Sequence, residues 1–477
     1  MQEFAPATKS IPTEILIKKS TLESHLEFSW SQEQTPATAK QEPTFLLFHF
    51  SALARYLYVI YLNTLSTSIL LRRISTLAGI LPEGVLRLKG HEMSEFKHLS
   101  NVYLLIEGGK IVQFGPDQEC QVERADAVID CTGKMVLPAF CDSHTHLVFA
   151  AWRENEFVDR IKGMSYEEIA KRGGGILNSA AKLQASSEDQ LFELAIERLY
   201  EVMRMGTGAI EIKSGYGLTV ESELKMLRVI RRIKELNLIP VRATFLGAHA
   251  MPTLFKSNRP EYIRLLTEEM VPQIAEQGLA DYVDVFCDKG FYTVEETDQI
   301  LEAGARYGLK PKIHANELDY SGGIQVGVKH QAVSVDHLEY TGPEEIASLA
   351  SSDTIATILP STAFFLGLPY APARNMIESN LCVALASDYN PGSSPSGNMS
   401  FILSLACVKL KMLPEEAFNA LTINGAAALE LGDKLGSITA SKSANLIITK
   451  PVSSLAYLPY SFGAGWIEKV IIGGKVI

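Results

Sequence analysis

The stretch Ala139-Phe-Cys-Asp-Ser-His144-Thr-His146 is an apolar run that ends at two histidines one residue apart. In an extended chain, residues i and i+2 point to the same side, so both imidazoles would face one point at the end of a buried strand. Such a pair supplies half of a metal site. The other half has to come from elsewhere in the chain.

Three later strand-like segments also end in groups that bind metals, namely His314, His337 and Asp388. Neutral imidazoles with one carboxylate suit zinc or another first-row metal such as iron, and so few ligands leave a position for water. A lone His-x-His pair is weak evidence because most isolated histidines are structural or solvated. Four such strand ends in one chain favour a shared metal centre.

Strands and helices alternate through the middle of the chain. Stretches such as 188–205, 222–236 and 294–307 carry apolar residues at the three- and four-residue spacing of helices, and they separate the strand-like segments. Eight such alternations predict a parallel (β/α)8 barrel, in which the chemistry lies at the carboxyl ends of the strands. The eight candidate strands end near Ser143, Lys213, Gly247, Cys287, His314, Asp336, Leu359 and Ser387.

An open doubly wound sheet is the alternative arrangement of alternating strands and helices. It often carries a Gly-x-Gly-x-x-Gly turn, and none follows the early strands. The Gly173-Gly174-Gly175 run suits a flexible active-site loop better than a phosphate-binding turn. The barrel is therefore the expected fold.

Short strands also occur near both ends of the chain, where Gly108-Gly109 and Gly473-Gly474 each interrupt two apolar runs as a hairpin turn would. Strands from both ends can pair into one small β-sandwich domain. We therefore expect an N-terminal extension at residues 1–70, a β-domain built from 71–137 and 433–477, and the barrel at 138–432.

The first part of the extension, residues 1–44, is rich in Thr, Gln, Glu, Ser and Pro, which predicts disorder or weak order. Residues 45–71 are apolar. Their uncharged run is shorter than the roughly 20 residues of a membrane span and is interrupted by polar residues, so we expect strands or an added extension rather than an anchor.

The composition limits the partners of the chain. The 477 residues carry a net charge of -11 without a long basic run, so nucleic acid and anionic membranes are not expected partners. The six cysteines are scattered and form no C-x-x-C pair, which indicates a reducing compartment. A cytoplasmic location follows from this inference.

Six motifs in order resemble the imidazolonepropionase family within the metal-dependent amidohydrolase superfamily. The resemblance covers approximately residues 75–477, whereas the first sixty or so residues are expected to be an added segment or an error in the gene model. The motifs are His144-Thr-His146, Glu211-Ile-Lys-Ser-Gly-Tyr216-Gly, Gly247-Ala-His249-Ala, His314-Ala-Asn-Glu317, Asp336-His337-Leu-Glu and Ser387-Asp388-Tyr-Asn390-Pro-Gly392-Ser393.

The resemblance implies hydrolysis of 4-imidazolone-5-propanoate to N-formimidoyl-L-glutamate, a step of histidine degradation, by a metal-activated water molecule. It also implies a homodimer and one metal ion per subunit, Zn²⁺ or Fe³⁺. Some relatives in the superfamily bridge two metals through a carboxylated lysine, but Lys213 lies after the second strand and is expected to be scaffolding, and Lys289 to lie on the surface. The implied metal ligands are His144, His146, His314 and Asp388.

The same resemblance assigns roles in catalysis. Glu317 would accept a proton from the water and return it to the departing nitrogen, and Asp388 would also take up a proton. His249 and His337 would donate hydrogen bonds to the ring and to the developing oxyanion. Arg153 would form a two-pronged bond with the propanoate of the small-molecule substrate. The implied substrate-binding residues are Arg153, Tyr216, His249, Glu317, Asn390, Gly392 and Ser393.

Two other functions stay open. One is a different cyclic amidohydrolase or aminohydrolase on the same scaffold, for which a carboxylate-binding arginine would serve no purpose. The other is a non-catalytic scaffold protein that kept the barrel, although such proteins usually lack one or more metal ligands and all four are present here.

Overall fold

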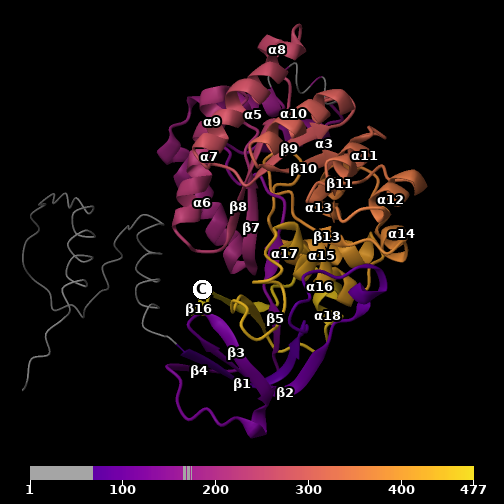
Figure 1. Ribbon diagram of the computed structural model, residues 1–477. Coiled ribbons are helices and arrows are strands. Elements are labelled where there is room, and N and C mark those ends of the chain that lie inside the picture. Colours follow the sequence, from indigo (N-terminus) through magenta and orange to yellow (C-terminus); the bar gives the residue numbers. More distant parts are fainter. Residues whose placement is uncertain (1–67, 165–167, 169–171, 173) are drawn as a thin grey trace, which may run out of the picture. The chain divides into compact units, whose positions relative to one another are not determined.

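The computed structural model describes residues 68–164, 168, 172 and 174–477 (Figure 1). The predictions for residues 1–67 and for Gly173 lie outside these residues. Within the described ranges, the strands form two sheets of eight strands each. None of the helices in these ranges combines the length and the hydrophobicity needed to span a bilayer.

The larger part of the chain forms the barrel. Its strands follow one another in chain order around the sheet and all neighbours pair in parallel. They are β6 (Phe140–Asp142), β7 (Thr207–Lys213), β8 (Val241–Ala248), β9 (Tyr282–Cys287), β10 (Lys310–Ala315), β11 (Ser334–His337), β12 (Ile355–Ile358) and β13 (Val383–Leu385).

The first and last strands meet at a seam that closes the barrel. Beyond the strand ends, the amide of Asp388 donates a hydrogen bond of 3.0 Å to the carbonyl oxygen of His144. The buried carboxylate of Asp142 accepts hydrogen bonds from the amide and the hydroxyl of Ser387, at 3.0 and 2.5 Å. Thr145 and Tyr389 add a parallel bridge. The predicted (β/α)8 barrel is confirmed.

Helices lie between the strands of the barrel, where the apolar spacing predicts them. In α6, the hydroxyl of the N-cap residue Ser187 accepts a hydrogen bond from the amide of Gln190, which satisfies one of the free N–H groups of the first turn. The principal helices are α3 (Glu154–Ile161), α5 (Ile176–Ala185), α6 (Glu188–Arg204), α7 (Val220–Glu235), α8 (Arg259–Arg264), α9 (Val271–Glu276), α10 (Val294–Arg306), α11 (Gly323–Lys329), α12 (Pro343–Ala350), α13 (Pro360–Leu366), α14 (Ala373–Glu378), α15 (Met399–Val408), α16 (Pro414–Leu421), α17 (Ile423–Ala428) and α18 (Tyr457–Tyr460).

The second sheet combines strands from both ends of the described chain, which Figure 1 shows side by side in indigo and yellow. Its order is β16-β15-β14-β5-β1-β2-β3, and β4 also pairs with β1. The strands are β1 (Ser68–Ala78), β2 (His98–Glu107), β3 (Lys110–Pro116), β4 (Ala127–Asp130), β5 (Met135–Pro138), β14 (Leu446–Thr449), β15 (Ile467–Ile472) and β16 (Lys475–Val476).

The two predicted glycine turns of this sheet touch each other. A Cβ atom added to Gly109 would lie 2.7 Å from the carbonyl oxygen of Gly473, and the amide of Ala444 donates to the carbonyl oxygen of Gly109 at 2.8 Å. The sheet therefore curls around a core of its own that includes Leu71 and Ile471. The small β-domain expected from both ends is thus one continuous sheet.

Close packing of α17 on the first barrel strand generates a prediction. A Cβ atom on Gly425 would lie 2.3 Å from the carbonyl oxygen of Cys141, so Gly425→Ala forces the helix away from β6. We expect a loss of about 1–3 kcal/mol in the free energy of unfolding. Denaturant titration measures this loss. Gly465→Ala, where the nearest atom is 3.9 Å away, is the matched control and should unfold like the parent chain.

Candidate metal centre and active site

Four side chains predicted as metal ligands converge above the barrel core. Nε2 of His144 and Nε2 of His146 each lie 3.4 Å from Oδ1 of Asp388, and Nε2 of His314 lies 3.4 Å from Nε2 of His146. All four residues are at most 2% exposed. The seam of the barrel brings β6 beside β13, and β10 lies across the barrel, so the three strand ends meet at one point.

Carboxylates on other barrel strands lie against the outer nitrogens of two of these histidines. Nδ1 of His144 lies 2.7 Å from Oδ2 of Asp336, and Nδ1 of His314 lies 3.0 Å from Oδ2 of Asp284, although the second pair is off the line of a hydrogen bond. A carboxylate at Nδ1 of His144 places the proton there and leaves the Nε2 lone pair facing the cluster. This is the orientation that a metal ligand needs.

The backbone of Asp388 adopts the left-handed conformation, with φ of 54°. Its Oδ2 accepts hydrogen bonds from the hydroxyls of Thr362 at 2.6 Å and Ser393 at 3.3 Å, so Oδ1 is turned toward the histidines. Burial alone would raise the pKa of Asp388, but His144 and His146 hold it well below its usual value. Asp388 is therefore an anionic oxygen donor.

The residues fit a metal ion. Among the described residues, the buried Nε2 of His144 has no hydrogen-bond partner, and buried polar atoms without partners are rare in folded proteins. Two groups of three side chains have ligand atoms within 4.8 Å of one another. One consists of His144, His146 and Asp388, and the other of His144, His314 and His337. The cluster could therefore bind a metal, and His337 lies close enough to take part.

A cavity of about 430 Å³ opens above the cluster. Every site residue predicted from the sequence lines this cavity except His144, which is fully buried beneath it. Several residues that the sequence did not single out also line it: Arg160, Ile176, Phe286, Phe291, Leu318 and Leu366. The cavity has the size of a small-molecule site.

The predicted acid–base and donor residues surround the cluster. Nε2 of His337 lies 3.7 Å from Oε2 of Glu317, and its Nδ1 lies 3.8 Å from Oε2 of Glu339. Burial raises the pKa of Glu317 to about 8. Burial alone would lower the pKa of His337, but Glu317 and Glu339 raise it to about 10. A cationic imidazole and a carboxyl that titrates near neutral pH therefore face the cavity.

His249 is a neutral counterpart on the other side of the cluster. Its ring stacks on that of His146, with the centroids 5.1 Å apart, and its Nδ1 lies 3.1 Å from the carbonyl oxygen of Gly215. Burial lowers the pKa of His249 to about 3. The carbonyl oxygen requires a proton on Nδ1. Tyr216 packs against the His249 ring, with the centroids 5.2 Å apart.

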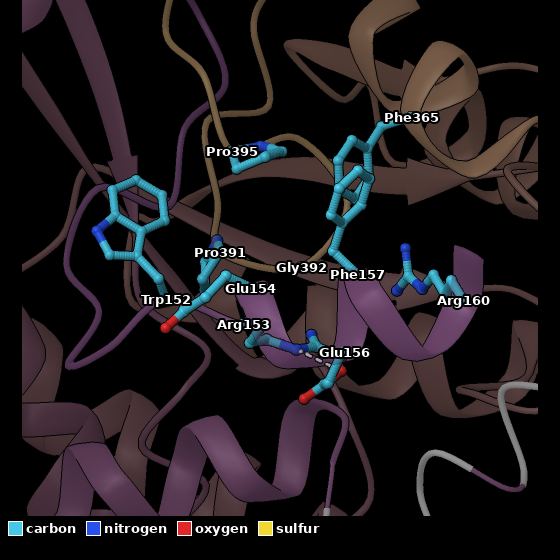
Figure 2. A pocket seen from close by; sticks show the side chains of 10 residues that line it. All are labelled: Trp152, Arg153, Glu154, Glu156, Phe157, Arg160, Phe365, Pro391, Gly392 and Pro395. Atoms are coloured by element: carbon cyan, nitrogen blue, oxygen red, sulfur yellow. Dashed lines mark hydrogen bonds and ion pairs between the residues drawn. The ribbon is translucent and has the colours of Figure 1, made fainter. Parts of the chain in front are cut away.

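Arg153 lines this cavity and is held by Glu156; Figure 2 shows the pair among the residues that line an adjoining cavity. Nε and Nη2 of Arg153 donate hydrogen bonds to Oε2 of Glu156 at 2.9 and 2.5 Å. Oε1 of Glu156 accepts a hydrogen bond from the backbone amide of Gly175 at 3.0 Å. A Cβ atom on Gly392 would lie 2.3 Å from Nη1 of Arg153. Gly392 is therefore required by the close approach of the guanidinium. Arg153, Arg160 and Gly392 also line an adjoining cavity of about 370 Å³.

The turn after Asp388 is stabilised from within. The side-chain amide of Asn390 accepts hydrogen bonds from the backbone amides of Gly392 and Ser393, at 2.7 and 2.8 Å. It also donates to the carbonyl oxygen of Asp388 at 2.7 Å and to the Ser393 hydroxyl at 2.8 Å. Asn390 therefore shapes this part of the cavity wall, and the substrate contacts of the turn stay a prediction.

Two buried carboxylates that support the cluster received no role from the sequence, although Asp336 stands in one of the six motifs. Asp284 and Asp336 lie inside apolar strands and are at most 1% exposed, and Lys213, expected to be scaffolding, is fully buried beside them. Single charged residues within otherwise apolar strands were the available signal. Lys289, expected on the surface, is exposed and pairs with Asp319 at 2.7 Å.

Comparisons with known proteins agree with this geometry. The amidohydrolase family matches residues 135–477. An imidazolonepropionase of Flavobacterium johnsoniae is 54% identical over 86% of this chain and 99% of its own length. One of Geobacillus thermodenitrificans is 40% identical over 85% of this chain and 96% of its own. The chain belongs to the amidohydrolase family and, within it, to the imidazolonepropionases, which are hydrolases of cyclic amides.

Solved structures share the fold at low sequence identity. An atrazine chlorohydrolase mutant of Arthrobacter aurescens, crystallised with zinc and atraton, has a TM-score of 0.63 at 16% identity and covers 86% of this chain and 94% of its own. A 5-methylcytosine deaminase of Klebsiella pneumoniae has a TM-score of 0.62 at 18% identity and covers 84% and 97%. At these identities, the likeness concerns the fold alone.

The convergence of the four predicted ligands leads us to expect that a metal ion stabilises the chain. Ligand present at about 1,000 times its dissociation constant adds about 4 kcal/mol to the free energy of unfolding. We expect the melting temperature of metal-depleted protein to rise when Zn²⁺ is restored, and His314→Ala to lose most of that rise. His91→Ala, at an exposed histidine, is the control. An equal rise in His314→Ala would contradict the site.

Proposed function

We propose that this chain hydrolyses the ring amide of 4-imidazolone-5-propanoate to N-formimidoyl-L-glutamate, a step of histidine degradation. The observation that carries the proposal is a single cavity that combines a metal-ligand cluster, a carboxyl that titrates near neutral pH and an arginine on one wall. Relatives named imidazolonepropionase, at 39–54% identity over most of the chain, support the assignment.

The ion is proposed to be one Zn²⁺ or Fe³⁺ per subunit, held by His144, His146, His314 and Asp388. Three imidazoles and a carboxylate suit either ion. Bound there, such an ion would make water nucleophilic near neutral pH and polarise the ring carbonyl. The chain's own residues must then bind the substrate and move the protons.

Glu317 is proposed as the proton carrier. With a pKa near 8, its carboxylate takes a proton from the attacking water and its carboxyl form gives the proton to the departing ring nitrogen. Asp388 is proposed to share the proton taken from the water. His337, next to Glu317 and cationic, would donate a hydrogen bond to the oxygen on which negative charge develops. Neutral His249 would present Nε2 to the ring.

The propanoate is proposed to lie against Arg153. Because Nε and Nη2 already bind Glu156, the carboxylate would approach Nη1, which packs closely against Gly392. Glu156 thereby keeps the planar group in one orientation before substrate arrives, which lowers the entropy lost on binding. Tyr216 and the turn at Asn390 and Ser393 are proposed to complete the pocket.

Three further proposals concern the oligomeric state, the location and the domain boundaries of the chain. We propose a homodimer and a cytoplasmic location; the cysteines among the described residues form no disulfide. We also propose that the domains divide at residues 71–137, 138–432 and 433–477, with residues 1–70 as an extension, of which residues 68–70 already belong to β1 of the small sheet. The two separate sheets support this division.

A different amidohydrolase or aminohydrolase reaction is the competing proposal, since a deaminase shares the fold. The oriented Arg153 argues against this reaction, because a neutral base has no carboxylate group for the arginine to bind. Purified, metal-loaded protein should therefore consume imidazolone propanoate. Protein that leaves this substrate unchanged and deaminates a base would reverse the assignment.

Substitution of the proton carrier provides one test. In Glu317→Gln the side chain keeps its shape but cannot accept a proton, so we expect kcat to fall about 100-fold or more. Loss of the imidazolone absorbance measures the rate. Metal content should stay at the level of the parent protein, and Glu344→Gln, at an exposed position of α12, is the control. Near-normal turnover in Glu317→Gln would refute the proton-carrier role.

Substitution of the arginine provides a second test. Arg153→Gln removes the charge that faces the propanoate, so kcat/KM should fall by about 10- to 100-fold, mainly through KM, in line with the loss of a charged hydrogen bond of about 1.5–3 kcal/mol. For an imidazolone that lacks the carboxylate, Arg153→Gln should change kcat/KM only slightly. Arg264→Gln, at a partly exposed arginine of α8, is the control. An equal loss for both substrates would exclude the carboxylate contact.

A further inference from the structure

Five charged side chains lie beneath the floor of the cavity and form what we call the charge layer: Glu211, Lys213, Asp284, Lys312 and Asp336. All are at most 1% exposed. They project into the barrel from four of its strands, β7, β9, β10 and β11. Ionised groups at such depth are costly unless they are paired, so their mutual contacts must be close.

Lys213 makes the largest number of ionic contacts in this layer. Its Nζ lies 2.7 Å from Oε1 of Glu211, 2.8 Å from Oδ2 of Asp284 and 3.6 Å from Oδ2 of Asp336. The other ammonium group, on Lys312, binds Glu211 and the carbonyl oxygen of Ser143. Lys213 is thus the ammonium that contacts both aspartates directly.

The same aspartate oxygens also face the ligand histidines. Oδ2 of Asp336 lies 2.7 Å from Nδ1 of His144, and Oδ2 of Asp284 lies 3.0 Å from Nδ1 of His314. One ammonium group therefore stands behind the outer nitrogens of two ligands that come from opposite parts of the barrel. Without it, three carboxylates would share the single ammonium of Lys312.

We propose that Lys213 is a positioning residue for the metal centre, which fixes Asp284 and Asp336 and through them the rings of His144 and His314. The inference rests on the proposed metal site and names a residue that supports it. Lys213 differs from the carboxylated lysine of two-metal relatives, because its ammonium group is engaged with the carboxylates of Glu211, Asp284 and Asp336.

The test is the zinc affinity of Lys213→Met, measured with metal-depleted protein against a chromophoric chelator. Outer partners of metal-binding histidines contribute about 10- to 100-fold to metal affinity, so we expect a loss of at least 10-fold. The control is Lys442→Met. Lys442 is also buried, but its Nζ binds the Ser437 hydroxyl and two carbonyl oxygens remote from the cluster. Lys442→Met should keep the zinc affinity of the parent chain.

A double-substitution cycle separates positioning from general stabilisation. If Lys213 acts through Asp336, Asp336→Asn should weaken zinc binding, and Lys213→Met should cost much less in the Asp336→Asn background than in the parent chain. Losses that simply multiply would overturn the proposal. If Lys213→Met fails to fold, Lys213→Gln and Asp336→Asn carry the test, and unchanged zinc affinity in both overturns it.

Zinc binding by the parent chain separates failure of the proposed metal site from failure of the role of Lys213. A parent chain that binds no zinc at the cluster would overturn the proposed metal site together with this inference. A parent chain that binds zinc, compared with a folded Lys213→Met that binds it within twofold, would overturn the role of Lys213 alone. Circular dichroism of the metal-depleted proteins shows whether each variant is folded before zinc is added.

Discussion

Closure of the barrel between β6 and β13 is the contact on which the rest of the site depends. Asp142 and Ser387 bond across the seam although they lie 245 residues apart in the chain. The adjacent bond from the Asp388 amide to the His144 carbonyl then places Asp388 beside the two histidines that follow the first strand. In a closed parallel barrel, all strands end at one rim, so residues from distant segments share a small space.

Beneath this rim the barrel contains charge instead of the usual apolar filling. The side chains of Glu211, Lys213, Asp284, Lys312 and Asp336 neutralise one another almost completely, with three negative and two positive groups. Buried ion pairs contribute little net stability because desolvation offsets their attraction. Their presence therefore fits the proposed role in positioning the histidines of the cluster better than a role in the stability of the barrel.

At the rim itself, polar groups are oriented by hydrogen bonds to neighbouring side chains and to the backbone. Glu156 holds Arg153, Asn390 holds the turn after Asp388, and the Gly215 carbonyl fixes the His249 ring. Each of these contacts removes rotational freedom from a group that faces the cavity. A small ligand would then bind to groups that are already placed, and this reduces the entropic cost of binding.

Several features of the fold and of the site could be predicted from the sequence alone. Strand ends and helical spacing predicted the barrel, and the spacing of His144 and His146 predicted a shared face, because both patterns are local and repeat every two or 3.6 residues. His314, Glu317 and Asp388 could be assigned because motifs place them at strand ends. The predictions for the first 67 residues lie outside the described part of the chain.

Other features depended on which strands become neighbours. The register of β10 between β11 and β9 sets His314 level with Asp336 and Lys312 level with Asp284. The side-chain contacts that result are His314 with Asp284 and Lys312 with Glu211. The sequence determined that charged residues occur within apolar strands, and the barrel determined which charges meet. Glu156 was likewise an ordinary helical glutamate until the fold set its carboxylate against Arg153. The spacing of nearby residues is determined by the sequence itself, whereas contacts across hundreds of residues depend on the register and closure of the whole sheet.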